Sequence, residues 1–314
     1  MDPVLILAGL GVGIVVGLTG MGGGALMTPL LVLVFGVPPL AAVSSDLAAS
    51  AVMKPFGGWV HARRGTVNWS LVRWLCLGSV PSAFCGVLLT RLIPGQAAVQ
   101  EYVQYALGIA LLLAATGLVA KAAAGRARAE PASTIAADPP LRLRPLPTVL
   151  LGMGGGLVVG LTSVGSGSLI IVILLALYPR LRPNSLVGTD LVQAVPLVAA
   201  AAFGHLLFGD LQFDLAGAIL IGSVPGVLLG ARLSSRAPAG IVRAGLVVVL
   251  LASGLKLFGV PNPVLAAVVA ALIAIGVLVA VSNRFALRSP VNAAQPEPIR
   301  ESDPHGVPLR RSSG

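Results

Sequence analysis

The sequence predicts an all-α polytopic membrane protein built from two helical repeats of inverted topology, with helices that are broken or re-entrant at glycines. Of the 314 residues, 56% are hydrophobic and only 10% are charged, and the mean hydropathy is +0.95. Soluble domains carry about 25% charged residues. Nearly uncharged runs close to the roughly 20 residues that a spanning helix needs recur along the chain. Much of the pattern then repeats 143 to 144 residues later.

The apolar runs between turn signals define the expected helices. An alternation of apolar and polar residues, typical of membrane barrels, is absent from the sequence, so helices are the expected class. The expected segments are 3–19, 25–36, 41–60, 69–90, 98–120, 147–163, 168–178, 185–207, 212–232, 240–257 and 263–282. Two of them, 25–36 and 168–178, are too short to cross a bilayer alone, which is typical of discontinuous helices or re-entrant hairpins.

Each short segment directly follows a glycine-rich interruption. The chain reads GLTGMGGG at 17–24 and GLTSVGSG at 160–167, and we name residues 20–24 the first break and residues 163–168 the second break. Other features recur at nearly the same shift, which indicates an internal duplication. They are Asp46 with Asp190, His61 with His205, and LGSVPS at 77–82 with IGSVPG at 221–226.

The basic residues predict the orientation of the two copies. If the basic linker 121–146 is cytoplasmic, most arginines fall on that side, and only Arg91 and Lys256 clearly fall opposite. The equivalent loops 61–68 and 205–212 differ, because the first carries two arginines and the second none. If each repeat crosses the membrane with five segments, the two copies have inverted topology. If the two segments on either side of a glycine break together cross the membrane only once, each repeat has four crossings and the two copies are parallel.

The expected domain boundaries follow from these segments. They are a first transmembrane repeat at 1–120, the basic and disordered cytoplasmic linker at 121–146, a second repeat at 147–257, an additional helix at 258–282, and a disordered basic cytoplasmic tail at 283–314.

The composition also argues against other classes of protein. The basic residues are scattered in connections rather than gathered on one soluble face, so nucleic acid is not an expected partner. The glycine runs lack the GxxxxGK[ST] pattern of a P-loop. Cys76 and Cys85 lie nine positions apart in one expected helix, about 13 Å along its axis, and cannot pair. We expect no metal, no cofactor and no enzymatic activity.

One face of the expected helix 41–60 carries the polar side chains. Asp46, Ser50, Lys54, Gly57 and His61 follow steps of three or four residues and share a stripe. Lys54 lies near the middle of the membrane, where a cation needs an anion: Asp46 through an intervening group, or a substrate. In the alternative, Lys54 extends toward the membrane surface or forms a structural pair.

The second copy has a different polar set. It retains Asp190 and His205, but its polarity moves to Thr189 and Gln193, so any site is asymmetric. We consider Asp46, Asp190, His61 and His205 as coupling-ion or gating residues. The alternatives are N-capping by the aspartates and satisfaction of helix-end carbonyls by the histidines.

The two breaks are the expected substrate site. Glycines let backbone amides turn outward, a helix N-terminus favours anions, and hydroxyl groups add donors without charge. Close packing of helices through small residues is the alternative reading. The candidate substrate-binding residues are Thr19, Gly22, Gly23, Gly24, Lys54, Thr162, Ser163, Gly165, Ser166, Gly167, Ser168 and Gln193.

These motifs resemble the TauE/SafE family of sulfite-exporter-like permeases over roughly residues 3–257. The resemblance rests on the GxGGG break at 20–24, the following Pro29 to Leu31, the small-residue helix from Ala41, the H-x-R-x-G loop at 61–65, and the helix at 78–86. Ser82 and Lys54 depart from the family pattern. The resemblance implies a multi-pass permease of the bacterial inner membrane that moves sulfite, sulfonates or related organosulfur anions, mostly outward.

We therefore expect a secondary transporter that exports small sulfur-containing oxyanions by alternating access between the two repeats. Its expected partners are the small anion and the lipid bilayer, and a homodimer is also considered. The alternatives are an anion channel, a permease for another small anion such as a carboxylate, and a membrane assembly factor that transports nothing.

Overall fold

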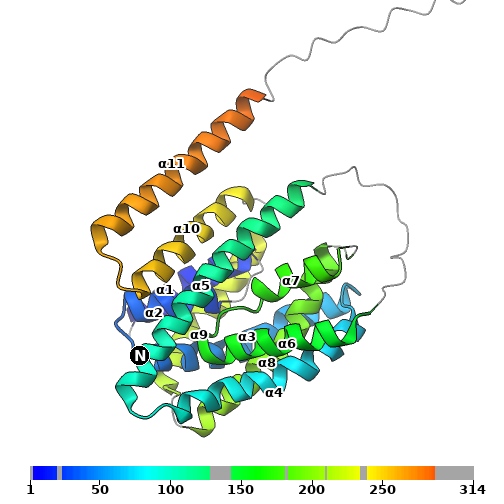
Figure 1. Ribbon diagram of the computed structural model, residues 1–314, viewed down its shortest axis with the longest axis vertical. Coiled ribbons are helices and arrows are strands. Elements are labelled where there is room, and N and C mark those ends of the chain that lie inside the picture. Colours follow the sequence, from blue (N-terminus) through cyan, green and yellow to red (C-terminus); the bar gives the residue numbers. More distant parts are fainter. Residues whose placement is uncertain are drawn as a thin grey trace, which may run out of the picture. The chain divides into compact units, whose positions relative to one another are not determined.

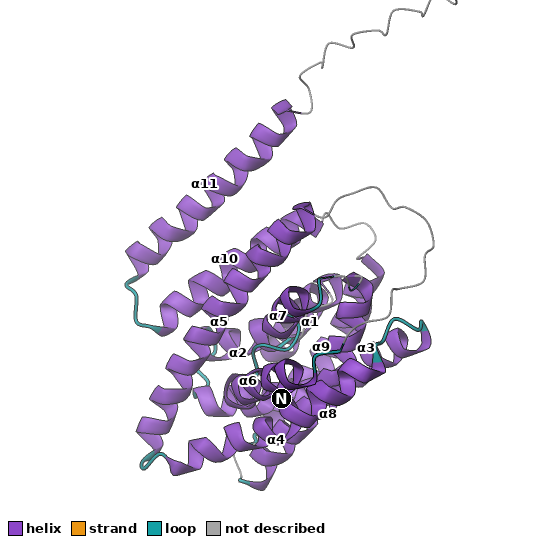
Figure 2. Ribbon diagram, turned by 45° about the vertical axis from the view of Figure 1, so that its right-hand side comes forward, coloured by secondary structure: helices purple, strands orange, loops and turns teal. Residues whose placement is uncertain are grey.

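The computed structural model describes residues 3–19, 23–127, 143–179, 181, 183–208, 211–233 and 239–286. Over these ranges the chain is helical and has no strand, which confirms the expected fold class (Figures 1 and 2). The helices are α1 (Pro3–Thr19), α2 (Gly24–Leu33), α3 (Pro39–Arg63), α4 (Trp69–Leu92), α5 (Gln96–Ala127), α6 (Pro145–Thr162), α7 (Leu169–Leu177), α8 (Pro183–Leu207), α9 (Phe213–Leu233), α10 (Ala239–Leu257) and α11 (Asn262–Ala286).

Five of the described helices are long and apolar enough to cross a membrane. They cover Trp69–Leu92, Gln96–Ala120, Pro145–Thr162, Ser185–Leu207 and Phe213–Gly230. The helices after the two breaks, α2 and α7, have only 10 and 9 residues, as expected. At 1.5 Å per residue neither reaches across about 30 Å of hydrocarbon.

The chain divides into two compact units, residues 1–272 and 273–314. All helix contacts described below lie in the first unit.

Two seams of small residues pair helices from different halves of the sequence. In one seam α6 lies beside α4, and the Cβ positions of Gly152, Gly156 and Gly160 fall on the backbone of α4. In the other seam α1 lies beside α9, where the contacts involve Gly222, Gly226 and Gly230. In both seams the contacts advance together along the two chains, so the paired helices run parallel. Without side chains between them, the backbones approach closely.

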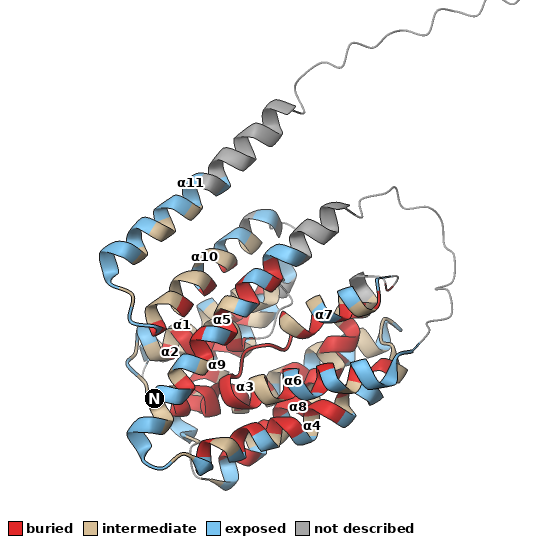
Figure 3. Cartoon of the chain, viewed as in Figure 1, coloured by how far each residue is buried: buried red, intermediate tan, exposed pale blue. Residues whose placement is uncertain are grey.

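The helices α3 and α8 pack in the opposite sense. Gly58 of α3 contacts Val192 and Val195 of α8, and the next turns of α3 reach Gly188, near the start of α8. The two helices therefore run antiparallel along this contact. Figure 3 shows that buried residues concentrate on α3, α4, α6 and α8, where the largest apolar cluster lies.

The α4–α6 seam predicts a sharp difference between two glycines of one helix. Gly156→Ala places a methyl group on the carbonyl oxygen of Ser79 and on the hydroxyl of Ser82. Such overpacking lowers the free energy of unfolding by roughly 1 to 3 kcal/mol. Gly154, two residues away, has open space around its Cβ position, so Gly154→Ala leaves stability unchanged or slightly raised.

Thermal unfolding of the two detergent-solubilised variants measures this difference. An equal melting temperature for Gly156→Ala and Gly154→Ala would contradict the close approach of α4 and α6.

Candidate functional site

The described end of the first break, Gly23 and Gly24, meets the second break in the structure. The first break precedes α2, which begins at Gly24, and the second break begins at Ser163, directly after α6. A Cβ atom on Gly24 would overlap the carbonyl oxygen of Ser163, so only glycine fits at this contact. Ser163 itself has φ 59°, and Gly165 and Gly167 also have positive φ angles. The second break is thus an unwound segment that lies against the start of α2.

The carboxylate of Asp46 joins the two breaks. Its Oδ2 atom accepts hydrogen bonds from Thr28 Oγ1 of α2 at 3.0 Å and from Ser163 Oγ at 2.6 Å. Asp46 is completely buried in α3, and its Oδ1 atom makes no hydrogen bond within the described part of the chain. This oxygen lies 3.9 Å from the Cβ position of Gly23. Three segments that are distant in sequence therefore converge on one carboxyl group.

Lys54 lies against the second break. Its ammonium group donates to Ser166 Oγ at 2.6 Å, and the residue is only 8% exposed. Asp190 and Asp46 are both close enough to interact electrostatically with it. The structure thus places a buried cation beside a break hydroxyl and within the field of two carboxylates, one from α3 and one from α8.

Three backbone amides at the end of the second break and the start of α7 turn toward one carbonyl oxygen. The N–H groups of Ser168, Leu169 and Ile170 all point to the carbonyl oxygen of Gly165, at 3.1 to 3.4 Å. The hydroxyl of Ser168 is buried and makes no hydrogen bond to any residue that the structure describes. Thr162 donates to its own helix at Val158. The hydroxyl group of Ser168 is therefore one donor that this break can offer to a ligand.

At the first break, no side chain caps the start of α2. Gly23 occupies the N-cap position, and its carbonyl oxygen accepts from the amides of Leu26 and Met27. The N-terminal end of this helix faces the buried Asp46 region. Gly22 lies outside the described residues, and only the backbone of Thr19, at the end of α1, is described.

Gln193 belongs to a contact between α8 and α4. Its Nε2 atom donates to Ser79 Oγ at 2.6 Å, while its Oε1 atom is buried and makes no hydrogen bond within the described ranges. Ser79 lies in the sequence LGSVPS, which recurs as IGSVPG in the second copy, and this recurrence is the sequence signal that could have identified the serine. Thr28, the other partner that sequence reasoning missed, is the one hydroxyl residue in the apolar α2.

The histidines lie at helix ends and bond to nearby backbone and loop groups. His61 Nδ1 lies 3.0 Å from Thr66 Oγ1, in the loop that follows α3. His205 Nε2 lies 3.2 Å from the carbonyl oxygen of Gly160, in the buried contact with α6. Neither of these contacts involves a residue of the two breaks.

The alternative interpretation, in which Asp46 and Asp190 cap the N-termini of their helices, is wrong. Helix α3 begins at Pro39 and α8 at Pro183, so Asp46 and Asp190 each lie seven residues inside a helix. Both helices begin well before their aspartates, because proline is favoured in the first turn of a helix. Within the ranges that the structure describes, no three His, Cys, Asp or Glu side chains gather as metal ligands would.

Comparison with known proteins gives a consistent picture. The chain matches the family described as "Sulfite exporter TauE/SafE" over residues 5–257. It is 38% identical over 258 residues to "Probable membrane transporter protein YjnA" of Bacillus subtilis, which covers 82% of this chain and 100% of that protein. A second B. subtilis relative, "Probable membrane transporter protein YdhB", is 24% identical over 246 residues, or 78% of this chain and 95% of the relative.

A "Probable membrane transporter protein" of Xylella fastidiosa is 28% identical over 227 residues, which cover 72% of this chain and 82% of that protein. No solved structure matches the chain.

The contact between the breaks predicts different effects at neighbouring glycines. Gly24→Ala pushes α2 away from Ser163 and lowers the melting temperature, with an overpacking cost of roughly 1 to 3 kcal/mol. Gly23→Ala meets only ordinary contacts, at 3.8 to 3.9 Å, and leaves the melting temperature nearly unchanged. Thermal unfolding in detergent separates the two. A more damaging effect of Gly23→Ala would show that the breaks do not meet at Gly24.

Proposed function

Because the chain belongs to the sulfite exporter TauE/SafE family of membrane transporters, we propose that it is a secondary transporter that exports small sulfur-containing oxyanions. Sulfite and small organosulfonates are the proposed substrates. They bind at the two glycine breaks and cross the bacterial cytoplasmic membrane by alternating access. Transport across a membrane follows from the family; the substrate class and the mechanism are our proposal.

The observation that supports an anionic substrate is the buried ammonium group of Lys54 at the second break. A cation in a low-dielectric interior is costly unless anions or dipoles surround it. Lys54 donates to Ser166, and the hydroxyl of Ser168 is buried nearby in sequence with no hydrogen bond among the described residues. An oxyanion offers several acceptor oxygens to such donors. Across from this break, the uncapped start of α2 adds a positive helix end.

We further propose that Asp46 and Asp190 carry the coupling proton. As a carboxylate, Asp46 accepts from both Thr28 and Ser163 and so holds the two breaks together. Protonation removes the negative charge that strengthens these hydrogen bonds. It also alters the field at Lys54, to which both carboxylates contribute. Binding of the anion and binding of the proton thus act on the same few contacts.

The packing supports inverted repeats, which we include in the proposal. The equivalent helices α3 and α8 run antiparallel, and each seam joins a helix of residues 1–120 to one of residues 147–257. Units of inverted topology give rise to two related conformations by rocking of one bundle against the other. In this arrangement the linker 121–146 and the C-terminal tail lie on the cytoplasmic side.

Lys54→Met tests the proposed site. Loss of the cation from a buried, hydrogen-bonded position costs at least about 2 kcal/mol of anion binding, so sulfite flux into proteoliposomes falls by about 30-fold or more. Lys256→Met is the matched control, because Lys256 bonds to Asn262 at an exposed position away from the breaks. That variant keeps the flux of the unmodified protein.

Elution and melting temperature of both variants in detergent show whether the fold is kept. Undiminished flux in a folded Lys54→Met variant would remove Lys54 from the transport mechanism.

A further inference from the structure

The outer face of α3 is apolar and ends in a cation. Val52, Phe56, Trp59 and Arg63 follow steps of four, three and four residues, so they lie on one side of the helix. All four side chains are exposed, Phe56 to 66% and Trp59 to 56%. Lys54 lies on the opposite side of α3 and is buried. We name the four exposed residues the α3 stripe.

The α3 stripe has the length of one membrane leaflet. From Val52 to Arg63 the helix rises about 16 Å, at 1.5 Å per residue. One leaflet contributes half of the roughly 30 Å of hydrocarbon in a bilayer, or about 15 Å. An acyl chain that lies along the stripe therefore brings its headgroup to the level of Arg63, which is the last residue of α3.

The guanidinium group of Arg63 is held by Trp59. Its central carbon lies 3.9 Å from the centre of the Trp59 ring, in a cation–π contact. Among the residues that the structure describes, this guanidinium has no hydrogen-bond acceptor and no acidic partner. Its N–H groups form a planar fork that matches the oxygens of a phosphate group. Stacking on the ring fixes the direction of that fork.

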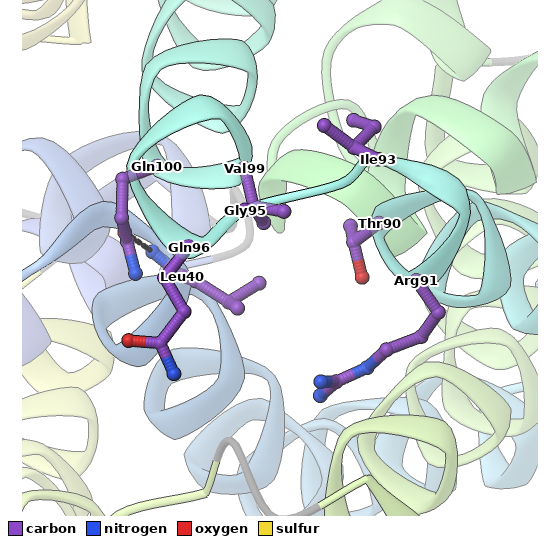
Figure 4. Close-up of a pocket in the computed structure, with 8 residues that line it drawn as sticks. All are labelled: Leu40, Thr90, Arg91, Ile93, Gly95, Gln96, Val99 and Gln100. Atoms are coloured by element: carbon purple, nitrogen blue, oxygen red, sulfur yellow. Dashed lines mark hydrogen bonds between the residues drawn. The ribbon is translucent and has the colours of Figure 1, made fainter.

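Arg91, near the end of α4, is held in a different way. It lines a polar pocket of about 260 Å³ (Figure 4), and its guanidinium group donates to the carbonyl oxygen of Phe208 at 3.0 Å. Arg91 thus bonds to the protein backbone, whereas Arg63 contacts the face of a ring. Of the two arginines, Arg63 is the one suited to a ligand from outside the protein.

The sequence around the α3 stripe is typical of a membrane surface rich in anionic lipid. The range 47–100 contains no acidic residue. All three tryptophans of the chain are exposed and fall between positions 59 and 74. Tryptophan is enriched at the boundary between membrane and water, and arginines there attract anionic headgroups. The loop after α3 is on the cytoplasmic side in the proposed orientation.

We propose that the α3 stripe binds one anionic phospholipid of the phosphatidylglycerol class. The phosphate group accepts from Arg63, and one acyl chain lies along Phe56 and Val52. The leaflet-long apolar face defines the acyl chain, and the stacked cation at its end defines the charge of the headgroup. The lipid is thus bound to the helix that carries Asp46, but its binding requires neither transport nor a particular substrate.

Tryptophan fluorescence tests the site. Trp69→Phe combined with Trp74→Phe leaves Trp59 as the one tryptophan of the chain. The purified protein is placed in phosphatidylcholine nanodiscs that contain equal small fractions of brominated phosphatidylglycerol or brominated phosphatidylcholine. Half-maximal quenching of Trp59 requires about fivefold less brominated phosphatidylglycerol, because one arginine at a membrane surface contributes about that factor in affinity. Equal quenching by the two lipids would overturn the site.

Two arginine variants separate a defined site from the general charge of the surface. Arg63→Gln abolishes the preference of Trp59 for brominated phosphatidylglycerol. Arg73→Gln removes the same charge from an exposed position in α4, on the same membrane side, and is the matched control. It keeps the preference. If both variants lower the preference equally, the attraction belongs to the whole basic surface, and the proposal is overturned.

Native mass spectrometry gives a second measurement, on a protein with all its tryptophans. The detergent-solubilised protein is titrated with phosphatidylglycerol and with phosphatidylcholine of the same acyl chains. We expect one phosphatidylglycerol per chain to survive activation that removes phosphatidylcholine, in the unmodified protein and in Arg73→Gln but not in Arg63→Gln. A lipid-free dimer that Phe56→Ser dissociates would show that a second copy covers the stripe, and would overturn the lipid site.

Discussion

The hydrogen bonds of the Asp46 carboxylate are the interaction on which the arrangement of the two breaks depends. A charged group without water is costly unless donors surround it, and here the donors come from α2 and from the second break. Because Ser163 lies at an interruption between helices and Thr28 lies in the short helix that follows the other interruption, the chain there keeps its position through side chains and close backbone contact. Asp46 thus converts two irregular segments into one defined site.

The small-residue seams provide the rigid frame around that site. In α4–α6 and α1–α9, backbones touch where larger side chains would separate the helices. These seams carry the helices that lead directly into the breaks, since α6 ends at Thr162 and α1 at Thr19. Any shift of one seam against the other therefore moves one break against the other, which is the motion that the proposed alternating access requires.

Much of this could be predicted from the sequence, because its signals are strong and local. The steps of four residues placed Asp46, Ser50 and Lys54 on one face, and all three are buried. Glycine runs before short segments marked the breaks. Periodicity carries no information on which partners meet across the bundle, so Thr28 and Ser79 were missed. The starts of α3 and α8 were expected at residues 41 and 185, two residues after Pro39 and Pro183, because the apolar runs rather than the prolines defined them.

Uphill transport by the unmodified protein is the most direct test of the proposed transport mechanism. Purified protein is reconstituted into proteoliposomes, and uptake of radiolabelled sulfite or methanesulfonate is measured with pH gradients of both directions and with none. We expect that one gradient direction drives the anion above its equilibrium concentration, and that an ionophore which collapses the gradient abolishes this accumulation. Flux that only equilibrates the anion under every gradient, or no flux at all, would contradict the proposed mechanism.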